Sequence, residues 1–354
     1  MSAIKPGYTR PLDLRHGRVD MSHGSGGRAM VQLIDQIFLS AFDNPALAAR
    51  DDHAVLAAPP ELALGGRLVM ATDSHVVSPL FFPGGDIGCL SVHGTVNDVA
   101  MAGARPLWLS AGFILEEGFA LAELHRIAGS MAQAAAEAGV PIVTGDTKVV
   151  QAGKGDGVFI NTTGVGVTRP GVHISGSLAQ PGDAILVSGT MGDHGVAVMS
   201  VREGLRFGTT LLSDTRSLHT LVAAMLDATP DIHVLRDPTR GGLGATLNEI
   251  ASQSGVGMRL METAIPVRGE VRAACELLGL DPLYVANEGK LLAICPPDRA
   301  DALLAAMRAH PHGRDAARIG TVVDDPNHFV QMTTALGGQR MVDWLSGEQL
   351  PRIC

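Results

Sequence analysis

Hydrophobic side chains recur at helical spacing most clearly between residues 121 and 138. Leu124, Ile127 and Met131 fall on one face of this segment, and Gly139 follows it as a helix stop. The pattern therefore predicts a structural helix over 121–138. Weaker patterns of the same kind predict helices at residues 28–42, 93–104 and 298–309, and one that begins near Leu243.

Short apolar runs bounded by glycine, proline or acidic residues predict strands between these helices. The stretch 168–182 is rich in glycine and proline, which is typical of a linker. Mixed strands and helices are therefore predicted on both sides of this linker. Strands are expected at residues 54–58, 68–72, 141–144, 159–167, 184–188 and 291–295.

Composition narrows the class of protein. A chain of 354 residues suggests about two domains, and 46% hydrophobic residues with 4% aromatics predict aliphatic cores. The net charge is −9 and no run of Lys or Arg occurs, so nucleic acid is not an expected partner. Residues 1–18 are polar, and no stretch of about 18 apolar residues is found. A soluble cytoplasmic protein without membrane association is expected.

The four cysteines are widely spaced, so the sequence contains no CxxC metal or redox motif. Cys89, Cys275 and Cys295 lie in apolar or helical context and are expected in the core. Cys354 is the last residue, after Leu-Pro-Arg-Ile at 350–353. Two interpretations stay open at this point, because a terminal tail is often poorly ordered. The cysteine is either incidental to a frayed end, or it is carried by a swinging arm that holds a group on sulfur.

Several carboxylates stand at the ends of predicted elements or inside an apolar helix. Asp73 follows the strand 68–72, and Asp98, beside Asn97, interrupts the apolar helix 93–104. Burying a carboxylate without a partner costs free energy, so a metal, another cation or a hydrogen-bond network must compensate the charge of Asp98. Each acid taken alone is also compatible with a turn. The full set, which would suit Mg²⁺ held by carboxylates and nucleotide phosphates, is Asp51, Asp52, Asp73, Asp98, Asp146 and Asp237.

Two glycine-containing stretches suit an anion. Gly145, Asp146, Thr147 and Lys148 offer backbone and hydroxyl donors, a carboxylate for metal and an ammonium group, which together suit phosphate. The alternative is a polar hairpin turn after the strand. Residues 22–27 (SHGSGG) precede a helix, but their spacing matches neither the Walker A nor the dinucleotide pattern. A flexible loop with a surface histidine, His23, is the alternative there.

The order and wording of the motifs carry more information than composition. The segments ARDDHAV, VMATDS, HGTVNDVAMAGARP, IVTGDTK, DPTRGG and ANEGK occur in that order. The chain thus resembles the superfamily of aminoimidazole ribonucleotide synthetase, selenophosphate synthetase and thiamine-monophosphate kinase. Within it, SHGSGG, LFFPGGDIG, GFILEEG, TGDTKVV, VSGTMGDHG and the ending PRIC resemble the HypE family of hydrogenase maturation factors, the carbamoyl dehydratases. The resemblance covers nearly the whole chain, but no motif matches between residues 333 and 348.

The resemblance implies an architecture. It implies an α+β protein with the two-domain fold of aminoimidazole ribonucleotide synthetase and a flexible C-terminal tail. Residues 1–167 would form an ATP-binding domain that pairs into a homodimer, and residues 177–332 a second α+β domain. Residues 333–354 would be a mobile tail that ends in the acceptor cysteine.

The resemblance also implies a reaction. A carbamoyltransferase partner would load a carbamoyl group onto Cys354, and ATP would then drive the loss of water to leave a thiocyanate. ATP would phosphorylate the amide-type oxygen, which turns a poor leaving group into phosphate. The cyano group would pass to an iron held by a scaffold complex, on its way to a [NiFe]-hydrogenase active site.

The implied roles follow residue by residue. Lys148 would neutralise charge on the γ-phosphate or on the phosphorylated intermediate, Glu288 would take the amide protons as general base, and Cys354 would be the carrier. Asp51, Asp73, Asp98 and Asp237 would hold Mg²⁺ with Asp52 close by, and Asn97, Gly145, Asp146 and Thr147 would contact nucleotide or metal.

Two rival functions are weighed against this hypothesis. Another ATP-dependent kinase or synthetase of the superfamily would have no use for a terminal cysteine. A non-catalytic metal or cyanide carrier would use Cys354 as a soft ligand. A single cysteine without neighbouring ligands makes a poor metal site, and the carrier would leave the acids without a purpose.

Overall fold

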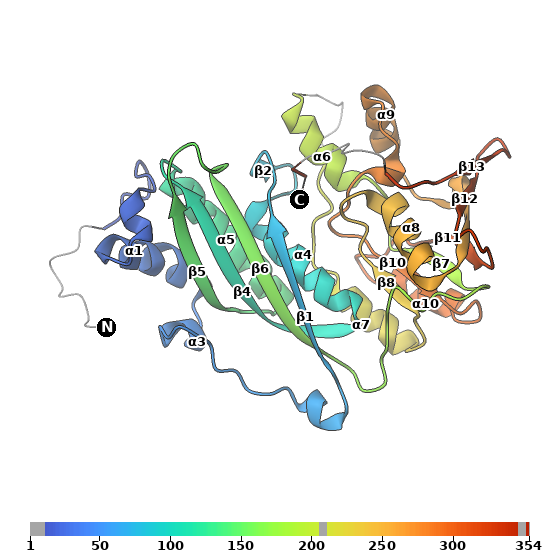
Figure 1. The fold of residues 1–354 in the computed structure, drawn as a ribbon, viewed down its shortest axis with the longest axis horizontal. Helices are drawn as coiled ribbons and strands as arrows, with labels where there is room; N and C mark the ends of the chain where they lie inside the picture. Colours follow the sequence, from blue (N-terminus) through green and yellow to red (C-terminus); the bar gives the residue numbers. More distant parts are fainter. Residues whose placement is uncertain (1–10, 205–210, 346–351, 354) are drawn as a thin grey trace.

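A computed structural model describes residues 11–204, 211–345 and 352–353, which form two larger sheets with their helices (Figure 1). The first sheet has the strand order β1–β6–β4–β5. Neighbouring strands are antiparallel except β4 and β5, which are parallel. Its strands are β1 (Leu68–His75), β4 (Ala104–Glu116), β5 (Ile142–Val150) and β6 (Val158–Thr168).

Two helices, α4 (Ile87–Met101) and α5 (Leu121–Ala138), pack on one face of this sheet and lie behind its strands in Figure 1. The helix predicted over 121–138 is confirmed, and Gly139 ends it in the left-handed conformation at φ 67°. Asp86 caps α4, because its Oδ1 accepts from the backbone N–H groups of Gly88 and Cys89.

The N-terminal helical segment continues from α1 (Arg28–Leu33) through a π-helical turn (Ile34–Leu39) into α2 (Ser40–Phe42), as predicted for 28–42. The alternative of a surface histidine at His23 is excluded: the residue is buried, and its Nδ1 accepts from the backbone N–H of Asp20 in a capping box. The smaller elements here are η1 (Met21–Gly24), α3 (Pro45–Ala48), η3 (Pro60–Leu64), β2 (Phe81–Phe82) and β3 (Gly85–Asp86).

Two segments in the first half differ from the strands predicted for them. Residues 54–58 form no strand, and Val55 is 85% exposed, because this apolar run has no neighbouring strand to pair with. The strand predicted over 141–144 is longer than expected, because β5 continues to Val150 in parallel register with β4, and this excludes the alternative of a turn at 145–148. The side chains of these residues therefore alternate between the two faces of the sheet.

The second sheet has seven strands in the order β13–β12–β9–β11–β7–β10–β8, and only β9 and β12 pair in parallel among them. The described strands are β7 (Ala184–Val187), β8 (Val234–Arg236), β9 (Gly257–Met261), β10 (Leu292–Cys295), β11 (Ala317–Val323), β12 (Val330–Thr333) and β13 (Gln339–Met341).

Helices lie on both faces of this sheet, which explains why β7 and β10 are apolar throughout. Ile185 and Val187 face a cluster with α8, whereas Ala184 and Leu186 face a cluster with α7 and α10. The helical elements of this half are α6 (Asp193–Arg202), α7 (His219–Ala228), α8 (Gly242–Ser254), η4 (Glu262–Ala264), α9 (Gly269–Leu278), η5 (Pro282–Tyr284) and α10 (Ala300–Ala309).

Part of the segment expected as tail belongs to the second sheet. β13 pairs with β12 across a hairpin whose turn contains Gly337 at φ 84°, and Val342 is buried. Paired structure therefore extends beyond residue 333, because the glycine turn lets the chain fold back. Residues 346–351 and Cys354 lie outside the described residues. None of the described helices combines the length and apolar character needed to cross a membrane.

Candidate functional site

The helix α4 brings together acids that are far apart in the sequence. Asp73 points from β1 toward this helix, and a Cβ added at Gly94 would lie 3.5 Å from its Oδ2. The tighter neighbour is His75, whose Cε1 would lie 3.0 Å from such a Cβ, so glycine at position 94 leaves room for this histidine beside the Asp73 carboxylate. One turn further along α4, Asp98 lines a cavity of about 600 Å³ together with Asp237, which precedes α8. Arg236, Arg240 and Glu249 line the same cavity.

Burial and neighbouring negative charge raise the pKa of two of these carboxylates, Asp98 and Asp237. Burial raises the pKa of Asp98 to about 8, with further contributions from the negative charges of Asp237 and Asp73. Burial also raises the pKa of Asp237 to about 6, and Asp73 adds to this shift while Arg236 opposes it. The cluster therefore favours a proton or another cation at neutral pH.

The acid cluster fits a metal that arrives with its own ligands. Among the described residues, no group of three or more His, Cys, Asp or Glu side chains is arranged to hold a metal ion. Mg²⁺ usually binds through one or two carboxylates, with water and phosphate oxygens completing its shell. The crowded carboxylates Asp98 and Asp237 match this incomplete type of site.

The raised pKa of Asp98 predicts an unusual stability effect. Between pH of about 4 and about 8 the folded chain keeps a proton on Asp98 that the unfolded chain has released, so the free energy of unfolding falls as pH rises through this window. Asp98→Asn should raise that free energy at pH 7 by about 1–3 kcal/mol, after allowance for the partial exposure of the group, and should flatten its pH dependence.

Urea denaturation at several pH values, with a chelator present, would measure this effect. Asp43→Asn, at an exposed carboxylate, is the control and should change little. Equal or lower stability of Asp98→Asn at pH 7 would contradict the electrostatic account.

Asn97, one residue before Asp98, connects the two halves of the molecule. Its Nδ2 donates to the carbonyl of Arg216 (3.0 Å), and its Oδ1 accepts from the backbone N–H of Leu218 (2.7 Å). Both polar groups of the side chain are thus engaged by the segment that precedes α7. These two hydrogen bonds fix α4 against the segment before α7, in the second half of the chain.

Glu288 lies next to this junction and is only 4% exposed. Its backbone N–H donates to Asp214 Oδ1 (3.1 Å), while its Oε1 has no hydrogen-bond partner among the described residues. Burial raises the pKa of Glu288 well above its ordinary value, and the charges of Asp237, Asp214, Asp73 and Asp98 act in the same direction. Such a carboxyl is typical of a proton-transfer group.

A buried charge network that the sequence analysis missed supports Glu288. Lys290 Nζ lies 3.3 Å from Asp214 Oδ2 and 3.6 Å from Asp193 Oδ2, and Thr190 Oγ1 donates to Asp193 Oδ2 (2.5 Å). Lys290 and Asp193 belong to the segments ANEGK and VSGTMGDHG, which carry the family resemblance, but the sequence analysis gave neither residue a role. No sequence signal indicated Asp214, because its segment contains no motif. A buried lysine between two carboxylates holds the loop before β10 in place.

The other predicted acids lie elsewhere. Asp51 and Asp52 share a cavity of about 540 Å³ with Gly145, Asp146 and Thr147 at the β5 edge. β5 and β1 are the opposite edge strands, so this group is about 14 Å from Asp73 across three strand spacings. The structure therefore gathers the predicted residues into two groups. Apolar side chains also line this cavity: Met30, Ile34, Phe38, Leu39, Phe42, Leu47, Ala111, Phe113 and Ile142.

Lys148 points away from the helices. Its register partner on β4, Ile114, is 43% exposed on the uncovered face of the sheet, and the Lys148 side chain is 66% exposed. Its Nζ forms an ion pair with Asp146 Oδ2 at 2.8 Å. Within this chain Lys148 and Glu288 thus lie on different sides of the first sheet, since α4 and Glu288 lie on the opposite face.

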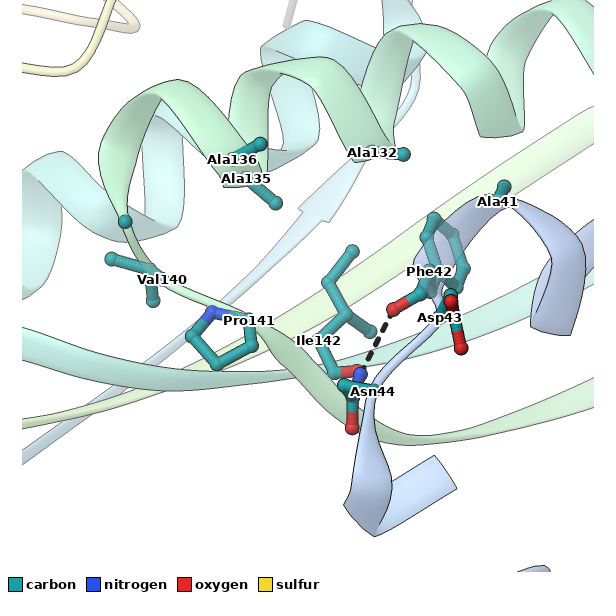
Figure 2. Close-up of a pocket in the computed structure, with 11 residues that line it drawn as sticks. Ala41, Phe42, Asp43, Asn44, Ala132, Ala135, Ala136, Val140, Pro141 and Ile142 are labelled. Atoms are coloured by element: carbon teal, nitrogen blue, oxygen red, sulfur yellow. Dashed lines mark hydrogen bonds between the residues drawn. The ribbon is translucent and has the colours of Figure 1, made fainter. Parts of the chain in front are cut away.

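A third cavity, of about 330 Å³, adjoins the one around Asp51 but offers little chemistry. Figure 2 shows alanines of α5 on one side and Phe42, Asp43 and Asn44 on the other. Asn44 Nδ2 donates to the carbonyls of Phe42 and Ile142, so it fastens α3 to β5. We assign this cavity no part in the site.

The chain is similar in sequence to proteins of known families. The models for AIR synthase related proteins match at residues 50–168 for the N-terminal domain and 180–333 for the C-terminal domain. The carbamoyl dehydratase HypE of Azotobacter vinelandii is 70% identical over 343 residues, which cover 97% of this chain and 99% of that protein.

Two solved structures are also similar. The crystal structure of hydrogenase maturation protein HypE in complex with ATP has a TM-score of 0.90 at 55% identity, and covers 94% of this chain and 99% of that chain. The crystal structure of a HypE–HypF complex has a TM-score of 0.77 at 48% identity, with coverage of 88% and 99%.

Proposed function

The chain belongs to the AIR synthase related family and, within it, to the HypE carbamoyl dehydratases, and from this we propose that it dehydrates an S-carbamoyl group on Cys354. The reaction would use ATP, leave a thiocyanate on the sulfur and supply the cyanide ligand for [NiFe]-hydrogenase iron. One observation carries the proposal. The carbonyl of Ile353 lies 2.7 Å from His194 Nε2. His194 contacts Ser213, and the next residue, Asp214, accepts from the backbone N–H of Glu288.

The proposed reaction balances in two steps. The carbamoyl oxygen attacks the γ-phosphorus of ATP, so that ADP leaves and the nitrogen gives up one proton. The carbon–oxygen bond then breaks, phosphate leaves with the bonding pair, and the nitrogen loses its second proton to form the C≡N bond. We assign Glu288 to accept these protons in turn, because its Oε1 is buried and lacks a hydrogen-bond partner among the described residues.

Magnesium would be held by Asp98 and Asp237 with Asp73 nearby, and when bound it would neutralise phosphate charge. Occupation of these acids would also remove the repulsion that helps keep Glu288 protonated. We propose that Asp51 and Asp52, with Gly145, Asp146 and Thr147, contact the nucleotide or its metal from the β5 edge. Asn97 would act by fixing α4, since both its polar groups are engaged.

We further propose that the uncovered face of the first sheet forms a homodimer. Leu68 and Met70 on this face are 59% and 73% exposed. Exposed apolar side chains clustered on one sheet face favour a protein partner, and a two-fold copy offers the same surface. Lys148 and Asp146 lie on this face as well, so dimerisation would bury the surroundings of the proposed phosphate contact.

Met70→Glu should convert the dimer to a monomer. A two-fold interface loses each contact twice and gains two charges, so we expect a loss of about 3–6 kcal/mol in association free energy. Light scattering after gel filtration would measure the mass. Leu277→Glu is the matched control, because Leu277 on α9 is 70% exposed, close to the value for Met70. A variant at Met70 that stays dimeric would rule out this face.

Three further proposals concern partners and location. The HypE–HypF complex supports a HypF-like carbamoyltransferase as the partner that loads Cys354. The cyano group would pass to an iron on a scaffold complex of the maturation pathway. We place this chemistry in the cytoplasm, where ATP is available.

Mass spectrometry of the wild-type chain tests the function. Incubation with the transferase, carbamoyl phosphate and ATP should first add a carbamoyl group to Cys354 and then remove one water from it. A carbamoyl adduct that never loses water in the presence of Mg-ATP would refute the dehydratase. Calorimetry with Mg-ATP distinguishes the dehydratase from a non-catalytic metal or cyanide carrier. The dehydratase should bind Mg-ATP, whereas the carrier hypothesis predicts no binding.

A further inference from the structure

The last two described residues occupy a defined position between the domains. The side chain of Ile353 is 3% exposed and packs in the core cluster that contains Phe82, Val198 and Ala286. Arg352 has a φ of 53°, which is costly for a residue with a side chain. The surrounding contacts must offset this cost.

One set of contacts binds Arg352. Its carbonyl accepts from the backbone N–H of Ser78 (3.1 Å) and from Arg202 Nη2 (2.7 Å). Arg202 is itself oriented by the carbonyl of Ser78, to which its Nε donates (2.9 Å). The guanidinium of Arg352 pairs with Asp156 Oδ2 at 2.8 Å. Both the backbone and the side chain of this residue are therefore recognised.

A second set of contacts binds Ile353. Its carbonyl oxygen can only accept, so His194 Nε2 carries the proton of the neutral ring and donates to it at 2.7 Å. Nδ1 of the same ring then accepts from the Ser213 hydroxyl (2.8 Å), whose oxygen also accepts from the backbone N–H of Thr215 (3.1 Å). His194 is fully buried, and Phe82 packs against its ring edge-to-face.

We infer that Ser78, Asp156, His194 and Arg202 form a seat that recognises Arg352 and Ile353, with His194 as a positioning residue for Cys354. The inference rests on the proposed function, because it assigns the seat to the group that undergoes dehydration. Ser213 hydrogen-bonds to Nδ1 of His194, and the adjacent Asp214 accepts from the backbone N–H of Glu288 (3.1 Å). One short segment thus links the bound end of the chain to the proposed base.

The seat would discriminate between different terminal sequences. The pocket for Ile353 is apolar, Asp156 selects a basic side chain before it, and two backbone carbonyls are fixed by Arg202 and His194. The carbonyl of Ile353 is bonded to the nitrogen of Cys354, so holding it limits where the sulfur can go. A cysteine on a different tail sequence would lack these contacts.

Thiol labelling of the full-length, uncarbamoylated chain tests the seat without ATP or transferase. Cys354 is treated with N-ethylmaleimide, and its modification is followed by peptide mass spectrometry. His194→Ala should raise the labelling rate about tenfold, because a lost buried hydrogen bond shifts a local docking equilibrium by roughly this factor. His194→Gln should keep the wild-type rate, since the amide Nε2 can donate where the ring did.

Two more variants complete the test. Ile353→Ala removes the buried apolar side chain of the bound segment, leaves the residues of the seat unchanged and should also raise the labelling rate about tenfold. If His194→Ala does not fold, this variant alone tests the seat. His173→Ala, at an exposed histidine, should label like wild type. Wild-type rates in both His194→Ala and Ile353→Ala would overturn the seat, as would His194→Gln behaving like His194→Ala. Failure to form thiocyanate with these labelling differences intact would refute the proposed function alone.

Discussion

Glu288→Gln is expected to lower the rate of thiocyanate formation by about 10²–10⁴-fold while ATP binding stays unchanged. The substitution keeps the shape of a side chain that is 4% exposed, but it removes the oxygen that can accept a proton. It also removes a buried carboxylate that repels Asp237 and Asp98, so the fold should not suffer. Single-turnover assays on carbamoylated protein, read by mass spectrometry, would give the rate.

The pH dependence provides a second readout of the same variant. Because the pKa of Glu288 is raised well above its ordinary value, the base form becomes more abundant as pH rises, and the wild-type rate should rise with it. Glu288→Gln should lose this dependence. Glu276→Gln, at an exposed position on α9, should retain both the rate and the pH profile. Turnover of Glu288→Gln at the wild-type rate would remove it as the base.

Local sequence pattern predicted those elements whose stability is local. The helix α5 has a long amphipathic stripe and a glycine stop, so its bounds follow from the sequence itself. The strand predicted at 141–144 was too short, and the alternative of a turn at 145–148 is excluded, because pairing with β4 extends β5 through that segment. A Cβ at Gly145 would lie 2.4 Å from the carbonyl of Ala111, so this glycine permits close strand approach rather than a turn.

The site could be predicted only in part for a similar reason. Acid motifs identified Asp73, Asp98 and Asp237, which the structure brings around α4. Sequence spacing could not show that Asp51 lies with the β5 edge instead, because the sheet order β1–β6–β4–β5 sets that separation. Asp214 was missed because its importance comes from tertiary contacts with Glu288 and Lys290, which no local pattern encodes.

The acid cluster and the bound end of the chain both lie near Glu288. Several carboxylates lie around Glu288, and the described residues alone do not form a complete metal site. Mutual repulsion and burial therefore favour the protonated form of Glu288 in the metal-free protein. A magnesium nucleotide would replace this proton and leave Glu288 able to accept one. The seat for Arg352 and Ile353 brings the end of the chain to the same place. Charge and tail position are thus complementary requirements for dehydration.

Cys354→Ala should abolish thiocyanate formation to below detection while Mg-ATP binding, measured by calorimetry, stays at the wild-type affinity. Alanine has no atom to carry the carbamoyl group, whereas the seat contacts belong to Arg352 and Ile353 and remain. Cys89→Ala is the matched control, because Cys89 is half-buried and burial raises the pKa of its thiol to about 11, which makes it a poor acceptor. It should form product normally. Product formation on Cys354→Ala would place the carried group on another residue, and neither the seat nor the order of steps proposed for Glu288 would then describe the reaction.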